Sequence, residues 1–422
     1  MLRHPVLRRL LPGFALSYVG EGMGLLAVSW LAIQLAPQAN AGVWVAAAVA
    51  AYTLPGALGT VLFARVLSGR SGAQLAAWDA VVRAVMLGAI PVVHLAGALD
   101  ISWYTVLLGL SSLLRSWGSA GRFTLIAELL PAEHRLAGNA LIGLFSEAST
   151  LVGPALAALL IAAGGPVLVI AVAAATFAVL AVSYLLAVPR TARAPIEERR
   201  GSSLAGFTAI WRDRRLLGLS ALTFGFFFLY GPVQVALPIH VAEALDNSAG
   251  TLAAFWTAFG VGAIIGGFAA GYLRRWRLWP TTIAIVLGWG AALLPLGVGA
   301  PIGVALVAIA IGGLIWAPYP ATTMALLQRS TDGAARAPVL AAYAAITTLS
   351  VPLGTIAAGP LITGVGAEAT ILAAAVLTVA FGVIAAAVAI SRAVRVRSAY
   401  DLADVETPGK ESVRQLDPEP LP

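Results

Sequence analysis

The chain contains no cysteine and few charged residues. Only 11% of its 422 residues are Asp, Glu, Lys or Arg, whereas about 25% is usual in globular proteins, and 60% are hydrophobic. A soluble domain of this length needs more charge to solvate its surface, so the composition excludes soluble enzymes, disordered scaffolds and secreted modules. Without cysteine, disulfides, thiol catalysis and thiolate metal sites are excluded as well.

Metal-binding and nucleotide-binding motifs are also missing. The four histidines, at positions 4, 94, 134 and 240, are far apart and have no metal-ligand spacing. No glycine-rich phosphate loop with a lysine is present, so we expect no cofactor and no direct use of ATP. Intramembrane hydrolysis would need a nucleophile with a base or metal ligands at mid-depth. Since none is found, we do not expect an enzyme.

Long apolar runs make up most of the chain. A membrane-spanning helix needs about 20 apolar residues. Runs of this kind predict twelve spans, at 11–35, 42–64, 75–97, 102–124, 138–162, 167–188, 216–240, 251–273, 279–298, 302–326, 338–363 and 367–391. The runs are continuously apolar and rich in Ala and Leu, unlike the short alternating strands of membrane barrels. The sequence therefore predicts an all-α membrane protein.

The basic residues predict the orientation of these spans. All of them except Arg83 and Arg115 fall in the N-terminal segment, in or at the border of loops that follow even-numbered spans, or in the C-terminal tail. Cytoplasmic loops are enriched in Lys and Arg, so both termini are expected in the cytoplasm, and the net charge of +7 indicates topology rather than nucleic-acid binding. The first span is too long for a signal peptide and is expected to be retained. Abundant Ala and Arg with almost no Lys are typical of a GC-rich bacterial genome, so we expect the protein in a bacterial inner membrane.

The chain divides into two similar halves. Arg8-Arg9-Leu10-Leu11 opens the first span and Arg214-Arg215-Leu216-Leu217 opens the seventh, while Arg135 and Arg336 repeat at a similar spacing near half the chain length. Such a repeat is typical of a duplicated domain. We predict six-helix bundles at 1–188 and 216–392, joined by a cytoplasmic linker at 189–215 and followed by a disordered tail at 393–422.

Several stretches resemble the major facilitator superfamily, within it the drug-exporter branch that includes macrolide-efflux-like and enterobactin-exporter-like proteins. They are SYVGEGMGLLAVSWLAIQLA in the first span, LLPAEHRLAGNAL and STLVGPALAALLIAAGG around the fifth, and LLQRSTDGAARAPVLAAYAAITTLSVPLGTIAAGPL in the second half. The resemblance implies two pseudo-symmetric six-helix bundles with alternating access. The chain departs from the family pattern at Ala64, where an Asp is expected, and at Gly118 and Ser119, where Gln and Gly are expected.

Three of the ionisable residues inside spans are candidates for proton coupling. Glu21 and Glu147 lie near mid-depth and Arg115 lies in the cytoplasmic half of the fourth span. Charges at such depths are costly and usually functional. An apolar setting favours the neutral carboxyl, so we expect Glu21 to hold a proton near neutral pH. If all three ionise, one negative charge remains, which favours cationic or neutral substrates. Alternatively, Glu21 is permanently paired with Arg115, and Glu147 serves interhelical hydrogen bonding.

Two further groups are candidates for conformational roles. Asp79 and Arg83 are four residues apart on one helix face, so they can bridge to the neighbouring loop near Arg65 as an inner gate, or form a simple local ion pair. Gly153 and Pro154 can act as a hinge in the fifth span, because proline removes a backbone donor. The alternative is ordinary helix packing by small residues.

Aromatic residues in the seventh and tenth spans predict a substrate site. Phe227, Tyr230, Trp316 and Tyr319, with Gln234 as a polar partner, could bind flat or lipophilic compounds and stabilise cations. Together these features predict a monomeric, proton-coupled exporter of amphipathic small molecules. The alternatives are a dedicated metabolite or siderophore exporter, an uptake symporter, and a non-transporting receptor.

Overall fold

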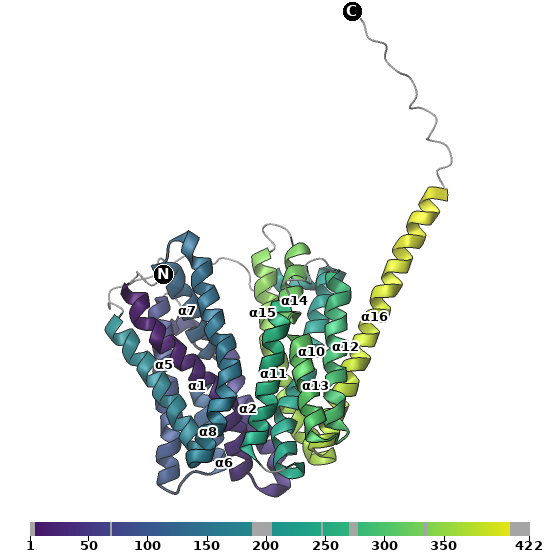
Figure 1. Cartoon of the computed structure of the whole chain (residues 1–422). Coiled ribbons are helices and arrows are strands. Elements are labelled where there is room, and N and C mark those ends of the chain that lie inside the picture. Colours follow the sequence, from purple (N-terminus) through teal and green to yellow (C-terminus); the bar gives the residue numbers. More distant parts are fainter. Residues whose placement is uncertain are drawn as a thin grey trace, which may run out of the picture.

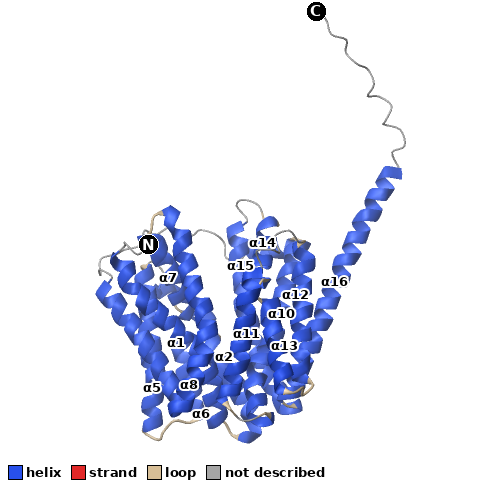
Figure 2. Ribbon diagram, viewed as in Figure 1, coloured by secondary structure: helices blue, strands red, loops and turns tan. Residues whose placement is uncertain are grey.

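The computed structural model describes residues 5–67, 70–187, 205–245, 248–269, 277–331 and 336–405. Within these ranges every regular element is a helix. Figure 2 shows long helices running side by side between the two ends of the molecule. The predicted all-α fold is confirmed.

The helices follow one another without any other regular structure between them in the described residues. The first half contains α1 (Pro5–Leu35), the short 3-10 helix η1 (Gln38–Asn40), α2 (Ala41–Thr53), α3 (Pro55–Leu62), α4 (Ala64–Leu67), α5 (Gly72–Leu95), α6 (Ile101–Ser112), α7 (Arg115–Leu129) and α8 (Ala132–Ala187). The second half contains α9 (Ala205–Arg212), α10 (Arg214–Ala244), α11 (Ala249–Ala269), α12 (Leu278–Gly297), α13 (Ile302–Trp316), α14 (Tyr319–Arg329), α15 (Arg336–Val365) and α16 (Ala367–Val405).

Polar caps fix where several of these helices begin. The Ser71 hydroxyl accepts a hydrogen bond from the Gln74 amide while the Gln74 side chain accepts one from the Ser71 amide, a capping box at the start of α5. Asp100 caps α6 and Asp213 caps α10 in the same way, through side-chain oxygens that accept backbone N–H groups. Each cap stands just before an apolar run, so the charged or polar residue marks the end of the membrane-embedded part.

Nine helical stretches in the described residues are long and apolar enough to cross a membrane. The expected span 42–64 is divided among α2, α3 and α4, and the expected span 102–124 is divided between α6 and α7. The fifth and sixth expected spans both lie in α8, which is interrupted at Gly164–Gly165, where Gly165 has a φ of 79° that glycine adopts without strain. The arrangement is consistent with twelve crossings.

Helices of the two halves form two groups that meet along a narrow seam (Figure 1). In the first group α1 and α5 pack against α8, and in the second α10 packs against α15, α12 against α16, and α11 against α13. The main packing contacts between the groups are those of α2 with α15 and of α8 with α11. These pairs hold the halves together.

The hydrophobic cores show at which end the halves meet. One large core combines residues of both halves, including Leu31 and Val49 from the first and Val235 and Ile362 from the second. At the end where α1 begins, each buried cluster of the described residues lies within a single half. The cluster with Leu10 belongs to the first half, and the cluster with Leu216 belongs to the second. The two halves therefore share a core at one end and have separate cores at the end where α1 begins.

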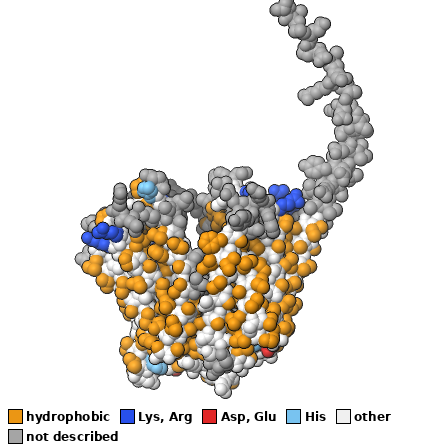
Figure 3. All heavy atoms as spheres, in the orientation of Figure 1, with side chains coloured by type: hydrophobic (Ala, Val, Ile, Leu, Met, Phe, Trp, Pro, Cys, Tyr) orange, Lys and Arg blue, Asp and Glu red, His pale blue; other side chains and the backbone are white. Residues whose placement is uncertain are grey.

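The surface agrees with a membrane environment. Figure 3 shows hydrophobic side chains covering the flank of both groups, with arginines at the upper rim. Large apolar side chains such as Leu186, Phe268 and Ile390 are exposed on this kind of surface. Burying such surface in lipid rather than water is favourable, so the chain is a multi-pass membrane protein.

Two regions differ from the linker and the tail that the sequence predicted. The expected linker contains the short helix α9, while residues 188–204 lie outside the described residues. Helix α16 continues to Val405, into the segment 393–422 that was expected to be disordered, because Arg, Ala and Leu residues after the apolar run are good helix formers. The remainder of that segment lies outside the described residues.

Candidate functional site

Helix α1 places Glu21 where it packs closely against its neighbours. Glycines flank the acid in the sequence: Gly20 contacts Thr176 and Gly22 contacts the backbone of Ser149, on the two parts of α8 that the break at Gly164–Gly165 separates. A side chain at either glycine would overlap these neighbours, so the small residues allow α1 and α8 to approach each other. The Glu21 side chain remains 19% exposed.

Arg115 is the partner of Glu21. Its Nη2 donates a hydrogen bond to Glu21 Oε1, and its guanidinium lies 5.6 Å from the centre of the Tyr52 ring. Arg115 is the first residue of α7, directly after the break that separates α7 from α6. With its side chain 31% exposed, Arg115 is the most accessible of the charged residues around Glu21.

The break before α7 lies beside the break between α2 and α3. Ser112 Oγ donates to the Ala51 carbonyl at 2.7 Å, Arg115 Nη1 donates to the Tyr52 carbonyl at 3.4 Å, and Trp117 Nε1 donates to the Gly59 carbonyl at 2.9 Å. Helix breaks leave carbonyl groups without helical partners. Ser112 and Arg115 bond to carbonyls just before the break, while Gly59 O also accepts the Phe63 amide, and the three side chains connect the two interrupted helices.

Asp79 and Arg83 join the same group from α5. Arg83 Nε donates to Asp79 Oδ1 at 3.0 Å, and Arg83 Nη1 lies 3.8 Å from Glu21 Oε1. Only 2% of the Arg83 side chain and 6% of the Asp79 side chain are exposed. Glu21, Asp79, Arg83 and Arg115 therefore form one charge cluster on α1, α5 and α7, with two acidic and two basic groups.

The surroundings of Glu21 differ from those expected from the sequence. We expected an apolar setting, but two guanidinium groups lie beside the carboxyl group. The buried Asp79–Arg83 pair belongs to the same cluster and adds one charge of each sign, so it leaves the net charge unchanged. The pairing of Glu21 with Arg115, which the sequence left as an alternative, is present; proton coupling by Glu21 stays a prediction.

Some of the predicted residues cannot be placed. The side chains of Glu147 and Arg65 lie outside the described residues, although both positions are within helices, α8 and α4. Asp79 and Arg83 form the local ion pair that was one of the two interpretations. A gating role for Asp79, Arg83 and Arg65 therefore remains a prediction.

Gly153 and Pro154 lie inside α8 without breaking it. The non-helical backbone of α8 is found further on, at Gly164 and Gly165. Gly153 is buried against the backbone of Gly22 on α1. This contact agrees with a role in helix packing, and a role as a hinge stays a prediction.

Aromatic rings of the second half form a continuous cluster. Phe227 lies 6.4 Å from Trp316 and 5.8 Å from Tyr319 between ring centres, and Tyr230 lies 5.9 Å from Trp289. Phe227, Tyr230, Gln234 and Trp316 are half-buried, and the Gln234 side chain is hydrogen-bonded to Tyr230. These four residues can present rings and an amide to a bound molecule.

Tyr319 is placed differently from the prediction. It is 0% exposed, its hydroxyl donates to Thr223 Oγ1 at 3.1 Å, and Thr223 Oγ1 is in turn 2.9 Å from the Tyr343 hydroxyl. A fully buried ring does not reach a substrate in this arrangement. Tyr319 is instead the first residue of α14, where it connects α14 to α10 and α15.

Sequence reasoning missed part of the aromatic cluster. Trp256, Phe259 and Trp289 extend it, with Phe259 5.6 Å from both Trp289 and Trp316. The spacing of three between Trp256 and Phe259 puts both on one face of α11, a signal that was available. Nothing in the sequence indicates that α12, which carries Trp289, packs beside these residues.

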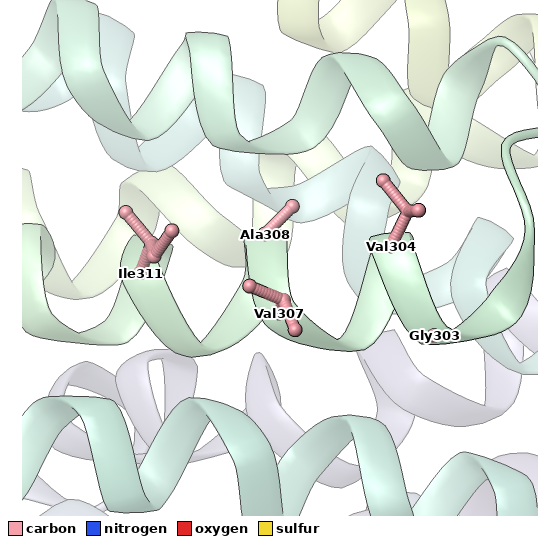
Figure 4. Close-up of a pocket in the computed structure, with 5 residues that line it drawn as sticks. All are labelled: Gly303, Val304, Val307, Ala308 and Ile311. Atoms are coloured by element: carbon pink, nitrogen blue, oxygen red, sulfur yellow. The ribbon is translucent and has the colours of Figure 1, made fainter.

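A shallow groove lies elsewhere, along α13. Figure 4 shows the five residues that line it, Gly303, Val304, Val307, Ala308 and Ile311. None of them is polar, and Val304, Val307 and Ile311 are exposed on the outside of the bundle. This groove is lipid-facing surface and contains none of the residues of the charge cluster or of the aromatic cluster.

Comparisons with known proteins identify the family. The model of the Major Facilitator Superfamily matches residues 10–337. The multidrug efflux pump Tap of Mycolicibacterium fortuitum is 24% identical over 384 residues, covering 87% of this chain and 91% of that protein. Its namesake in Mycobacterium tuberculosis (strain ATCC 25618 / H37Rv) is 26% identical over 391 residues, covering 87% and 89%.

Solved structures of other transporters have the same fold. The nucleoside transporter NupG has a TM-score of 0.70 at 12% identity, covering 90% of this chain and 98% of that one. A bacterial homologue of the lysosomal transporter Spinster, in an inward-facing and unoccupied conformation, has a TM-score of 0.67 at 14% identity, covering 90% and 95%. Because the family model matches most of the chain, this protein belongs to the major facilitator superfamily.

Proposed function

We propose that the protein is a proton-coupled exporter of amphipathic, cationic or neutral small molecules in the bacterial inner membrane, working as a monomer with both termini in the cytoplasm. Membership of the family makes it a membrane transporter and not an enzyme. The relatives named multidrug efflux pump support export of drug-like compounds. Export, proton coupling and the class of substrate are the proposed parts.

The observation that carries the proposal is the charge cluster around Glu21. Its two acids and two arginines are neutral together when all four are ionised. Adding one proton to Glu21 leaves one excess positive charge in a protein interior, where charges are poorly screened. The protonated cluster therefore repels a cationic substrate, while the deprotonated cluster does not. Proton and substrate would then exclude each other, as exchange transport requires.

Accessibility favours Glu21 as the proton site within this cluster. Its side chain is 19% exposed and that of Arg115 is 31% exposed, whereas Asp79 and Arg83 are nearly inaccessible. On this ground a proton is expected to reach Glu21 more readily than Asp79. Arg115 can follow as the ion pair forms and breaks.

The cores of the two halves support alternating access. They are shared at one end and separate at the end where α1 begins. The arginine distribution assigns that second end to the cytoplasm. In this arrangement a substrate would enter from the cytoplasm, and rocking of the halves would release it on the other side.

The half-buried rings of the second half suit lipophilic substrates. Phe227, Tyr230 and Trp316 offer ring faces, and Gln234 offers an amide. A cation over an aromatic face gains about 0.5–2 kcal/mol, more where water is excluded. Such contacts depend little on the detailed shape of the molecule, in keeping with a broad range of substrates.

Proton flux in sealed vesicles tests the proposal. Purified protein is reconstituted with an acidic interior, and a lipophilic cationic dye, a neutral amphipathic antibiotic or an organic anion is added outside. We expect the cation or the neutral compound to dissipate the pH gradient, and Glu21→Gln to abolish this effect. The exposed Glu243→Gln on α10 is the matched control and should couple normally.

Two results would overturn the proposal. One is a wild-type protein for which no compound changes the gradient. The other is a Glu21→Gln variant that couples as well as the wild type. Accumulation of substrate together with protons, instead of exchange, would indicate an uptake symporter and would overturn the assigned direction.

A further inference from the structure

Asp79 occupies a notch that Gly118 creates on α7. A Cβ atom at Gly118 would overlap the carboxyl group of Asp79. One turn along, Gly121 packs against the backbone of Gly72 and Ala76, so α5 and α7 are in backbone contact here. Asp79 is only 4% exposed. Gly118, where the sequence departs from the family pattern, has no side chain, and the Asp79 carboxylate fills the space that a side chain would occupy.

Arg83 lies between the two carboxylates of the charge cluster. Its Nε is hydrogen-bonded to Asp79 at 3.0 Å, but its Nη1 is 3.8 Å from Glu21, too far for a hydrogen bond and close enough for strong attraction. Its guanidinium is 4.9 Å from the centre of the Phe177 ring. Nη2 is buried and has no hydrogen-bond partner among the described residues. Small rotations of the side chain can therefore move Arg83 from one carboxylate toward the other.

We propose that Asp79 is a positioning residue, held in the Gly118 notch, that competes with Glu21 for Arg83 and so sets the pH at which Glu21 exchanges its proton. The inference rests on the proposed function, because it concerns the same proton site. When Glu21 is ionised, Arg83 is shared between two acids. When Glu21 is protonated, Arg83 pairs with Asp79 alone and the buried pair stays neutral.

Other groups around the two acids do not duplicate this role. Glu21 contacts Arg115 from α7 and lies near Arg83 from α5; Arg122 of α7 also acts on its charge, and Tyr52 of α2 lies beside Arg115. Arg122 in turn lies over the ring of Tyr18 on α1, at 4.9 Å. Asp79 faces Arg83 and, from α8, Tyr184. Within the described side chains of these elements, Asp79 is the second carboxylate near Glu21.

The charge of Asp79 gives the direction of the effect. Asp79→Asn keeps the shape that fits the notch but removes the negative charge, leaving Arg83 and Arg115 both free to pair with Glu21. More acid is then needed to protonate Glu21. We expect the pH midpoint to move toward acid by about one pH unit, a typical effect of one nearby charge. Gly118→Ala, which displaces the carboxylate without removing its charge, should move the midpoint in the same direction.

Infrared titration of the carboxyl stretch measures this midpoint directly. Spectra of the detergent-solubilised full chain are recorded across pH for the wild type, Asp79→Asn and Gly118→Ala, and the Glu21→Gln spectrum identifies the Glu21 band. Gly109→Ala on α6 is the matched control, because its Cβ would lie 3.9 Å from Ala51 and overlap nothing. The same variants are then tested for the pH dependence of flux.

The outcomes separate this inference from the proposed function. A midpoint that moves toward acid in Asp79→Asn and Gly118→Ala, and stays unchanged in Gly109→Ala, supports the inference. An unchanged midpoint or a shift toward alkali in Asp79→Asn overturns it. If that variant does not fold, Gly118→Ala decides by the same criterion. Absence of proton-linked flux in the wild type overturns only the proposed function, since the infrared midpoint does not depend on transport.

Discussion

Replacing Gly153 by alanine tests how closely α1 and α8 must pack around Glu21. A Cβ at Gly153 would lie 2.7 Å from Gly22 Cα and 2.8 Å from Gly22 O, whereas ordinary contact begins at 3.4 Å. Both neighbours are backbone atoms and cannot rotate away. The helices must therefore separate by about 1 Å, and overpacking of this kind costs about 1–3 kcal/mol.

The separation also affects the charge cluster. Gly22 directly follows Glu21, so α1 carries the carboxyl group away from α8 as the helices part. The 3.8 Å distance between Arg83 and Glu21 would change with it. We expect Gly153→Ala to lower both the thermal stability of the protein in detergent and its proton-linked flux.

Gly143→Ala is the matched control on the same helix. A Cβ at Gly143 would meet nothing within 4 Å, and the glycine is exposed. Alanine there gains about 1 kcal/mol of helix propensity without overlap. Thermal unfolding of the two variants in the same detergent, followed by vesicle flux, makes the comparison. A Gly153→Ala protein as stable as Gly143→Ala would refute the argument that backbone contact at Gly22 limits the packing of α1.

Three further predictions follow from other contacts. Cβ atoms at Ala46 and Gly359 would be 3.3 Å apart, just below the disulfide range of about 3.5–4.5 Å. The Ala46→Cys/Gly359→Cys variant should therefore cross-link under oxidation and lose flux. The cysteine-free background makes the gel shift unambiguous, and a protein that transports while fully cross-linked would contradict it. Tyr319→Phe removes the buried bond to Thr223 and should cost about 1 kcal/mol in thermal unfolding, an expectation that an unchanged melting temperature would refute. Trp316→Ala should reduce vesicle transport of aromatic cations more than that of neutral aliphatic compounds, and an equal loss for both would count against ring contact.

The sequence alone was enough to predict that the chain is helical and lies in a membrane. Long apolar runs and low charge leave no other fold for most of the chain, because backbone groups in lipid must be satisfied within each helix. It also identified Glu21 and Arg115 as unusual, since charge inside an apolar run is rare. Their pairing could be named as an alternative because charged residues inside membrane spans usually pair with one another.

Tertiary structure decided which side chains meet. The sequence indicated Asp79 and Arg83 as a local pair on one helix, and only the packing of both α1 and α5 against α8 brought Arg83 to Glu21. The aromatic residues show the same limit: Tyr319 and Trp316 are three apart, yet one is fully buried and the other is half-buried. A break between α13 and α14 at Ala317–Pro318 separates them and turns the Tyr319 ring toward Thr223.

Periodicity and hydropathy report on one helix at a time. They indicate that a residue lies inside the bilayer, and they do not indicate which neighbouring helix it faces, because every face of these helices is apolar. Small residues such as Gly22, Gly118 and Gly153 set that choice by allowing backbones to approach within the space of a missing side chain. Contacts between distant segments depend on this fit, and the fit exists only once the helices are packed.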